Sequence, residues 1–249
     1  ATTLTEPVRW ARGDPLEALA SKLFLLSASG MAREEAPMPA KAIRIERWHP
    51  ANASEQALAE GFGLLVDAHY RTTPADLRQW LDDPAAVSWC AWHQGRIVGI
   101  LWAAMEGGLD GDLAQAVTLG QRRIRGHLLA QSLAAHSGFP EAAAQRTLRV
   151  VRVAVAGPAR RSGVGKRLVA AAREWAVGQQ LDSLGTSFGG SPELLAFWQS
   201  CGMNVVRVGF QRENTSGEYP LQMLTGSSPQ GVKLVDRLRG RLARHWLTL

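Results

Sequence analysis

Hydrophobic positions along the chain recur with two periods, one typical of strands and one typical of helices. Period-two alternation and short apolar runs predict strands at residues 43–48, 87–93, 96–105, 148–155, 182–188, 203–210 and 219–224. Apolar residues at helical spacing predict helices at residues 16–26, 54–68, 74–82, 167–177, 192–200 and 230–246. Residues 107–145 are polar and helical in parts. The run 148–155 is apolar apart from Arg149 and Arg152, which fits a strand covered on both faces.

The pattern divides the chain into a main domain and two extensions. Residues 1–42 hold a short helix capped by Asp14, and then a stretch with glycine and prolines that is typical of a linker. A core built from these residues alone would be too small to fold, so we expect them to pack against the next domain or against a part absent from this chain. The main domain spans residues 43–225, and residues 226–249 form a C-terminal amphipathic helix.

Composition narrows the class of protein. The 249 residues are 46% hydrophobic and 20% charged, which is ordinary for a globular protein and excludes a mainly disordered chain. The net charge of +6 favours an anionic partner. Cys90 and Cys201 form no CxxC pair, so we expect no disulfide framework and no metal site. The apolar runs are too short to span a membrane and no signal peptide is visible, so we expect a reducing, cytoplasmic setting. Because the first residue is alanine, we expect the chain to be part of a longer protein.

The most informative segment is a strand, then Arg-x-x-Gly-x-Gly, then a helix, at Arg160–Lys166. Glycines let the backbone approach an anion, and the N–H groups and dipole of a helix start favour phosphate. A P-loop would need glycine at 160 and serine or threonine at 167, but both positions are arginine. A dinucleotide fingerprint would need glycine at 168, which is leucine. Taken alone, the segment is also compatible with a plain glycine-containing turn.

Its surroundings make the segment more specific. The strand Val150–Val155 precedes it, and a further strand and the segment Ala196–Met203 follow. Over residues 43–225 this order resembles the GCN5-related N-acetyltransferase (GNAT) family. The resemblance implies an α/β fold, with a central mixed sheet flanked by helices, and acetyl-CoA as cofactor. The residues that it places on the cofactor are Val153, Ala154, Val155, Arg160, Arg161, Ser162, Gly163, Val164, Gly165 and Lys166.

A closer resemblance spans nearly the whole chain. It is carried by the blocks Ala68–Arg78, Glu106–Leu109, Arg125–His136, Arg149–Val155 and Ser187–Gly189. Together they are similar to the bacterial tRNA(Met) cytidine acetyltransferases, which acetylate N4 of the wobble cytidine of elongator tRNA(Met). The resemblance implies tRNA as partner, together with a helicase module of the same longer protein. Residues 5–26 resemble the end of that module, but no P-loop is present, so the resemblance does not extend to ATP use.

The candidate catalytic residues are His69, Tyr70 and Glu193. The family's usual acid is a tyrosine at the position of Trp198, and an indole N–H cannot transfer a proton at neutral pH. Of the two tyrosines, Tyr70 beside His69 is the better candidate, although a thiolate with a free pKa of ~8.5 can also leave unassisted. The resemblance places Glu193 near the reacting end; the alternative is a first-turn residue stabilised by the helix dipole. We interpret Cys201 and most tryptophans as core.

The candidate RNA-binding residues are Arg122, Arg123, Arg125 and His136. The three arginines form a basic run without a carboxylate, which suits phosphate but also suits a solvated face. His136 is equally compatible with a structural hydrogen bond. Two other functions stay open: an acetyltransferase for a small amine or a protein lysine, and a non-catalytic module that binds acetyl-CoA or RNA.

Overall fold

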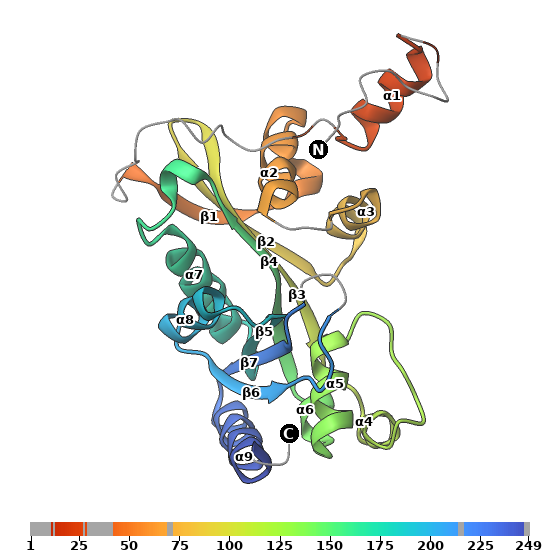
Figure 1. The fold of residues 1–249 in the computed structure, drawn as a ribbon, viewed down its shortest axis with the longest axis vertical. Helices are drawn as coiled ribbons and strands as arrows, with labels where there is room; N and C mark the ends of the chain where they lie inside the picture. The colour runs from red at the N-terminus through yellow and green to blue at the C-terminus, as the bar shows by residue number, and fades with distance from the viewer. Residues whose placement is uncertain are drawn as a thin grey trace.

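A computed structural model describes residues 11, 13–26, 28, 42–68, 72–213 and 217–246 of the chain. Within them a seven-stranded sheet has the order β1-β2-β3-β4-β5-β7-β6 (Figure 1). β4 and β5 are parallel and all other neighbours are antiparallel, so the sheet is mixed, as predicted. The strands are β1 Arg44–Trp48, β2 Ala86–His93, β3 Arg96–Gly107, β4 Arg146–Val155, β5 Ser183–Gly189, β6 Asn204–Val208 and β7 Pro220–Gly226.

Helices cover both faces of the sheet (Figure 1). Gly61 of α2 lies against Ile100, whereas Leu168 of α7 lies against Gly99. Because neighbouring residues of a strand face opposite sides, α2 and α7 lie on opposite faces. α3 and α5 share the α2 face, and α8 lies with α7. The helices are α1 Pro15–Leu23, η2 Pro50–Asn52, α2 Glu55–Ala68, α3 Pro74–Asp82, α4 Gly111–Thr118, α5 Leu128–Ser137, α6 Glu141–Ala144, η3 Gly157–Ala159, α7 Val164–Gly178, α8 Pro192–Ser200 and α9 Pro229–His245.

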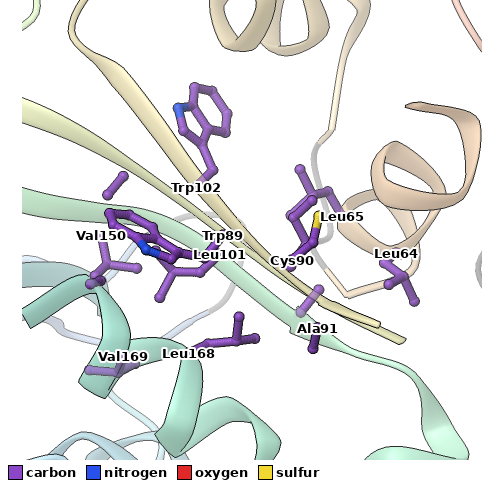
Figure 2. Packing of buried hydrophobic residues seen from close by; sticks show 14 of the residues in the cluster. Leu64, Leu65, Trp89, Cys90, Ala91, Leu101, Trp102, Val150, Leu168 and Val169 are labelled. Atoms are coloured by element: carbon purple, nitrogen blue, oxygen red, sulfur yellow. The ribbon is translucent and has the colours of Figure 1, made fainter. Parts of the chain in front are cut away.

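The main core lies on both sides of β2, β3 and β4. Figure 2 shows Leu65 and Trp102 on the α2 side and Leu168 on the α7 side of these strands. Buried tryptophans form much of the α2 side: the rings of Trp80 and Trp102 are 6.3 Å apart, and Trp80 Nε1 donates to Ser88 Oγ at 2.7 Å. Truncating a buried aromatic of this kind to alanine typically costs about 3–5 kcal/mol.

A second core lies under the segment that the sequence analysis interpreted as polar. α4, α5 and α6 bury alanines, leucines and a valine against β6, β7 and α9; these include Val117, Leu129, Leu133, Leu224 and Leu234. The apolar stripe of α9 packs against this cluster, as its spacing predicts. Polar residues fill the exposed sides of these short helices, so the average composition of 107–145 obscured the buried stripe.

Most predicted elements are present, and several of their ends differ by one to three residues. α1 ends at Leu23 rather than Leu26, and β6 ends at Val208 rather than Phe210. α7 begins at Val164 rather than after Lys166, because Gly163, at φ +86°, serves as its N-cap. The run 148–155 was predicted to be covered on both faces, but Arg152 and Val153 are only half-buried. The reason is that β4 has no partner strand on one edge at this end, as described below.

The N-terminal extension contributes α1, whose N-cap Asp14 accepts from Leu16 N at 2.8 Å, as predicted. Lys22 of α1 pairs with Glu55 of α2 at 3.5 Å, and an apolar pocket lies between α1, α2 and α3. Leucines of α1 nevertheless remain exposed, among them Leu16, Leu19 and Leu23. In the part of the chain that the structure describes, no helix is both long and apolar enough to cross a membrane.

Candidate active site

The parallel strands β4 and β5 stop pairing before either strand ends. Their last paired residues are Val150 and Thr186, although β4 continues to Val155 and β5 to Gly189. Beyond that point β4 pairs only with β3, and β5 pairs only with β7. We call this end of the two strands, residues 151–155 and 187–189, the β4–β5 fork. Along this fork each of the two strands has a neighbouring strand on one side only.

Hydrogen-bond alternation on β4 determines which backbone groups face the fork. Ala156 N donates to Val98 O at 2.9 Å, so Ala156 bonds toward β3. In an antiparallel pair, the backbone N–H and C=O groups of successive residues point alternately toward the partner strand and away from it. Ala154 therefore also bonds toward β3, whereas the N–H groups of Val153 and Val155 point away from β3 and into the fork. Of the three strand residues predicted to contact the cofactor, two thus offer N–H donors there and one does not.

The glycine-containing loop follows β4 and leads into α7. Arg160 Nε donates to Val155 O at 2.9 Å, which holds the loop against the end of β4, and Ser162 Oγ donates to Ala159 O at 2.6 Å, which fixes the loop internally. Arg161 and Gly163 have positive φ, +60° and +86°. This conformation turns successive N–H groups toward one side, which is an arrangement that binds anions.

The start of α7 leaves backbone donors available for a phosphate. The first intrahelical bond runs from Arg167 N to Gly163 O, and no side chain caps this helix. The N–H groups of Val164, Gly165 and Lys166 therefore have no partner within the helix. Val164 is buried and can contribute only its backbone. No atom lies within 4 Å of where a Cβ of Gly163 would be, so the loop is open at that glycine. The site therefore fits a pyrophosphate.

α8 closes the other side of this loop. Its buried Trp198 lies 4.9 Å from the Phe197 ring and 6.2 Å from the Phe188 ring of β5, which confirms the interpretation of Trp198 as core. Glu193 is exposed in the first turn of α8, after the N-cap Ser191.

Cys201, at the end of α8, is not a candidate nucleophile. Burial raises the pKa of its thiol, which makes that residue a poor nucleophile.

On the α2 face, a buried ion pair joins β3, β4 and α5. The Glu106 side chain is fully buried and pairs with Arg149 Nε. Its other oxygen accepts from Leu129 N at 2.7 Å and Ala130 N at 3.1 Å, at the start of α5. His127 Nδ1 accepts from Gly107 N at 2.8 Å. The blocks 106–109 and 125–136 therefore meet in space, and their shared role is to fix α5 beside β4.

A second ion pair on this face joins β4 to α3. Arg152 contacts Asp76 at 2.9 Å and Thr72 Oγ1, and its guanidinium lies 6.0 Å from the Trp102 ring centroid. The sequence pattern predicts no role for the Arg152 side chain. The signal that could have found it is a charged residue inside an otherwise apolar strand. His69 and Tyr70, which precede Thr72, lie outside the described residues.

Tyr219, the other tyrosine, lies at the fork end of the sheet. Gly190 N donates to Tyr219 O at 2.9 Å, and the next residue, Pro220, pairs with Gly189. The ring is 43% exposed and lies 5.2 Å from the Arg212 guanidinium. The structure thus places Tyr219 at the end of the sheet where β4 and β5 part.

The predicted RNA-binding residues lie on α5 and on the connection that precedes it. Arg122, Arg123 and Arg125 are exposed between α4 and α5, and His136 is exposed near the end of α5. Burial, together with the charges of Arg207 and Arg123, lowers the pKa of His136. Two arginines of α9 lie near these residues and differ in their contacts. Arg237 pairs with Glu141 and lies 4.3 Å from the Phe139 ring, whereas Arg241 donates to His136 O at 3.4 Å.

Solved structures share this fold at low sequence identity. Arabidopsis thaliana NAA60 in complex with acetyl-CoA matches with a TM-score of 0.51 and 12% identity, over 74% of this chain and 98% of that chain. Ard1 from Thermoplasma volcanium matches with a TM-score of 0.50 and 14% identity, over 74% and 97%. These likenesses bear on the fold alone.

Curated relatives match almost the entire chain. The tRNA(Met) cytidine acetyltransferase TmcA of Photorhabdus asymbiotica is 40% identical over 98% of this chain, and that of Salmonella typhimurium is 41% identical over 97%. The chain spans 36% and 35% of these relatives, about a third of their length. The profile of the Acetyltransferase (GNAT) family matches residues 51–203, which is more than half of the chain. The chain therefore belongs to the GNAT family of acetyltransferases.

Proposed function

We propose that this chain is the acetyltransferase part of a longer tRNA-modifying enzyme and acetylates N4 of the wobble cytidine of elongator tRNA(Met). The observation that carries the proposal is the similarity of about 40% to tRNA(Met) cytidine acetyltransferases over nearly the whole chain, including α1 and α9 outside the family match. If the similarity were confined to the fold that all GNAT proteins share, it would support an acetyltransferase but would not indicate which acceptor receives the acetyl group.

Acetyl-CoA, when bound, supplies the acetyl thioester. The N–H groups of Val164, Gly165 and Lys166, at the positive end of α7, are suited to hold its pyrophosphate. The N–H groups of Val153 and Val155 face the β4–β5 fork, where they can stabilise negative charge that develops on a carbonyl oxygen. Arg160 and Ser162 act mainly by holding the loop, because their side chains already bond to backbone oxygens.

The charges on the α2 face suit a neutral amine. A lysine or polyamine acceptor arrives as an ammonium ion and needs a carboxylate that is free to receive it. The carboxylates described on this face next to β4, Glu106 and Asp76, are each paired with an arginine. The N4 amine of cytidine is uncharged, so the protein need only orient it and accept the proton that leaves nitrogen. His69, Tyr70 and Glu193 are our candidates for that proton transfer.

The proposal includes two partners, a helicase module and tRNA, and places the reaction in the cytoplasm. Exposed leucines on α1 fit an extension that packs against the helicase module of the longer protein. The basic run Arg122–Arg125 fits contact with tRNA phosphates. We place the reaction in the cytoplasm, which agrees with a tRNA acceptor and with the free thiols of Cys90 and Cys201.

The test is acetyl transfer from labelled acetyl-CoA to tRNA, a polyamine and a lysine peptide in parallel, with and without a supplied helicase module. We expect label in tRNA alone. Transfer of label to the polyamine or to the peptide instead of tRNA would contradict the proposed acceptor. Binding of acetyl-CoA without transfer to any acceptor, even with the helicase module, would indicate a non-catalytic module.

A further inference from the structure

A basic cavity lies between α5, β6 and α9, away from the loop that suits the cofactor. It has a volume of about 220 Å³, and its lining includes His136, Arg207, Phe210, Arg241 and His245. These residues come from three separate segments of the sequence, so no local motif predicts the cavity. It lies on the α5 face of the sheet, the same face as Arg149 and Arg152.

The charges around this cavity are not balanced by the protein. Burial lowers the pKa of Arg207, and the charges of Arg207 and Arg123 act with burial to lower the pKa of His136. Within residues 72–213 and 217–246, no carboxylate forms an ion pair with Arg123, Arg207 or Arg241. A half-buried cation without a counter-charge is costly, so an anion in this cavity would relieve both desolvation and mutual repulsion.

Other arginines on this side of the molecule have carboxylate partners. Arg149 and Arg152 are partly buried and pair with Glu106 and Asp76, and the more exposed Arg237 pairs with Glu141. Arg207 lacks one, although burial lowers its pKa as it lowers that of Arg152. Its counter-charge is therefore expected to come from outside the chain.

The strand register places this cavity close to the β4–β5 fork. Arg207 pairs with Gln222 on β7, and Gln222 pairs with Ser187, the first β5 residue beyond the last β4–β5 pair. Two strand spacings separate β6 from β5, which is roughly 10 Å. Gln222 Nε2 also donates to Ser132 Oγ at 2.9 Å, which ties β7 to α5 one helical turn before His136. An anion held by Arg207 thus lies within reach of a nucleotide next to one whose base is at the fork.

An exposed aromatic ring stands at the same place. Phe210 lines the cavity and is 65% exposed, so one face of its ring is open to solvent. Unpaired RNA bases stack on such rings, and single-stranded RNA presents a phosphate beside every base. A cation beside an aromatic face can bind a phosphate and its neighbouring base together, whereas a free inorganic anion would use the cation alone.

We infer that the cavity formed by His136, Arg207 and Arg241 is a phosphate subsite for the RNA acceptor, with Phe210 as a stacking platform for an adjoining base. This inference rests on the proposed function, since it assumes an RNA acceptor. It also joins the exposed run at Arg122–Arg125 to the fork, because Arg123 already acts electrostatically on His136. The RNA path then runs from the α4–α5 connection across β6.

The test is binding of an elongator tRNA(Met) transcript across a salt series to wild type, Arg207→Gln, Arg207→Lys and Phe210→Leu. Arg239→Gln is the matched control, because Arg239 lies on α9 beside Asp236 and outside the cavity. We expect Arg207→Gln to reduce the slope of log affinity against log salt by about 0.7, the value for one phosphate on a single strand. Arg207→Lys should keep the slope, and Phe210→Leu should weaken binding about 10-fold at an unchanged slope.

Binding of acetyl-CoA to each variant, measured by calorimetry, serves as the folding control and should equal that of wild type. Equal slopes and affinities for Arg207→Gln, Arg239→Gln and wild type would overturn the subsite while leaving the proposed function standing. If wild type neither binds nor acetylates the transcript, the proposed function and the subsite fail together. Loss of binding in Arg239→Gln as large as in Arg207→Gln would mean that only net charge matters, which also contradicts the inference.

Discussion

A Cβ on Gly165 would lie 3.2 Å from Phe197 Cε2, so the first turn of α7 and the ring on α8 are in direct contact. That separation is tighter than ordinary side-chain packing, and a larger residue would push α8 away from the loop. The two glycines of the Arg-x-x-Gly-x-Gly segment therefore have different physical roles. Gly165 allows helix packing, whereas Gly163 supplies a positive φ at an open position.

The open glycine gives the first prediction. Gly163→Asp should abolish stabilisation by acetyl-CoA, because a carboxylate enters the position at which we place the pyrophosphate. For wild type, ligand at 100 times its Kd should add about 2.7 kcal/mol, or roughly 5–10 °C in Tm. Gly163→Asn is the matched control, because it is similar in size, tolerates positive φ and carries no charge. Thermal melts with and without acetyl-CoA measure the effect. An equal shift in Gly163→Asp and wild type would move the cofactor elsewhere.

The buried pair between Glu106 and Arg149 gives the second prediction. Glu106→Gln should lower the free energy of unfolding by about 3–5 kcal/mol, because it leaves the Arg149 charge without its partner in a buried site. Urea denaturation measures the change. Glu55→Gln is the matched control, since its pair with Lys22 is exposed and the substitution should change stability by about 0.5 kcal/mol or less. A loss in Glu106→Gln as small as in Glu55→Gln would contradict the role of this carboxylate in holding α5.

These sites also show what the sequence could and could not reveal. The loop at Arg160–Lys166 and the helix after it were predictable, because glycine spacing and apolar periodicity are local. The β4–β5 fork was not, since the register between two strands depends on side chains far apart in the chain. Arg152 and Arg207 were missed for the same reason: a carboxylate partner, or the lack of one, becomes visible only when helices and strands meet. Residues 107–145 concealed a core because their apolar stripes are short.

The third prediction concerns proton transfer. If Tyr70 supplies a proton or orients cytidine, Tyr70→Phe should lower kcat by about 100-fold, the lower range for general acid–base catalysis, and leave acetyl-CoA affinity unchanged. Steady-state kinetics with tRNA, combined with calorimetry for acetyl-CoA, separates the two effects. Tyr219→Phe is the comparison, because Tyr219 is the chain's only other phenol. Full activity in Tyr70→Phe with a loss in Tyr219→Phe would transfer the role to Tyr219, and full activity in both would favour unassisted thiolate departure.

The fourth prediction concerns the exposed arginine run. Replacing Arg122, Arg123 and Arg125 together by glutamine should flatten the salt dependence of tRNA binding by roughly 2 in slope, if all three contact phosphates. Acetyl-CoA affinity should not change, because the cofactor loop lies on another part of the molecule. Parallel salt plots with equal intercepts would show that the run is only a solvated face.

The central claim is that this chain transfers acetyl groups to a cytidine amine in tRNA. The most direct measurement is mass spectrometry of nucleosides from elongator tRNA(Met) after incubation with the protein and acetyl-CoA, with the helicase module supplied. We predict N4-acetylcytidine in the natural transcript and none in a transcript whose wobble cytidine is replaced by uridine, which has no amine. Acetylated cytidine in both transcripts, or in neither, would contradict the account.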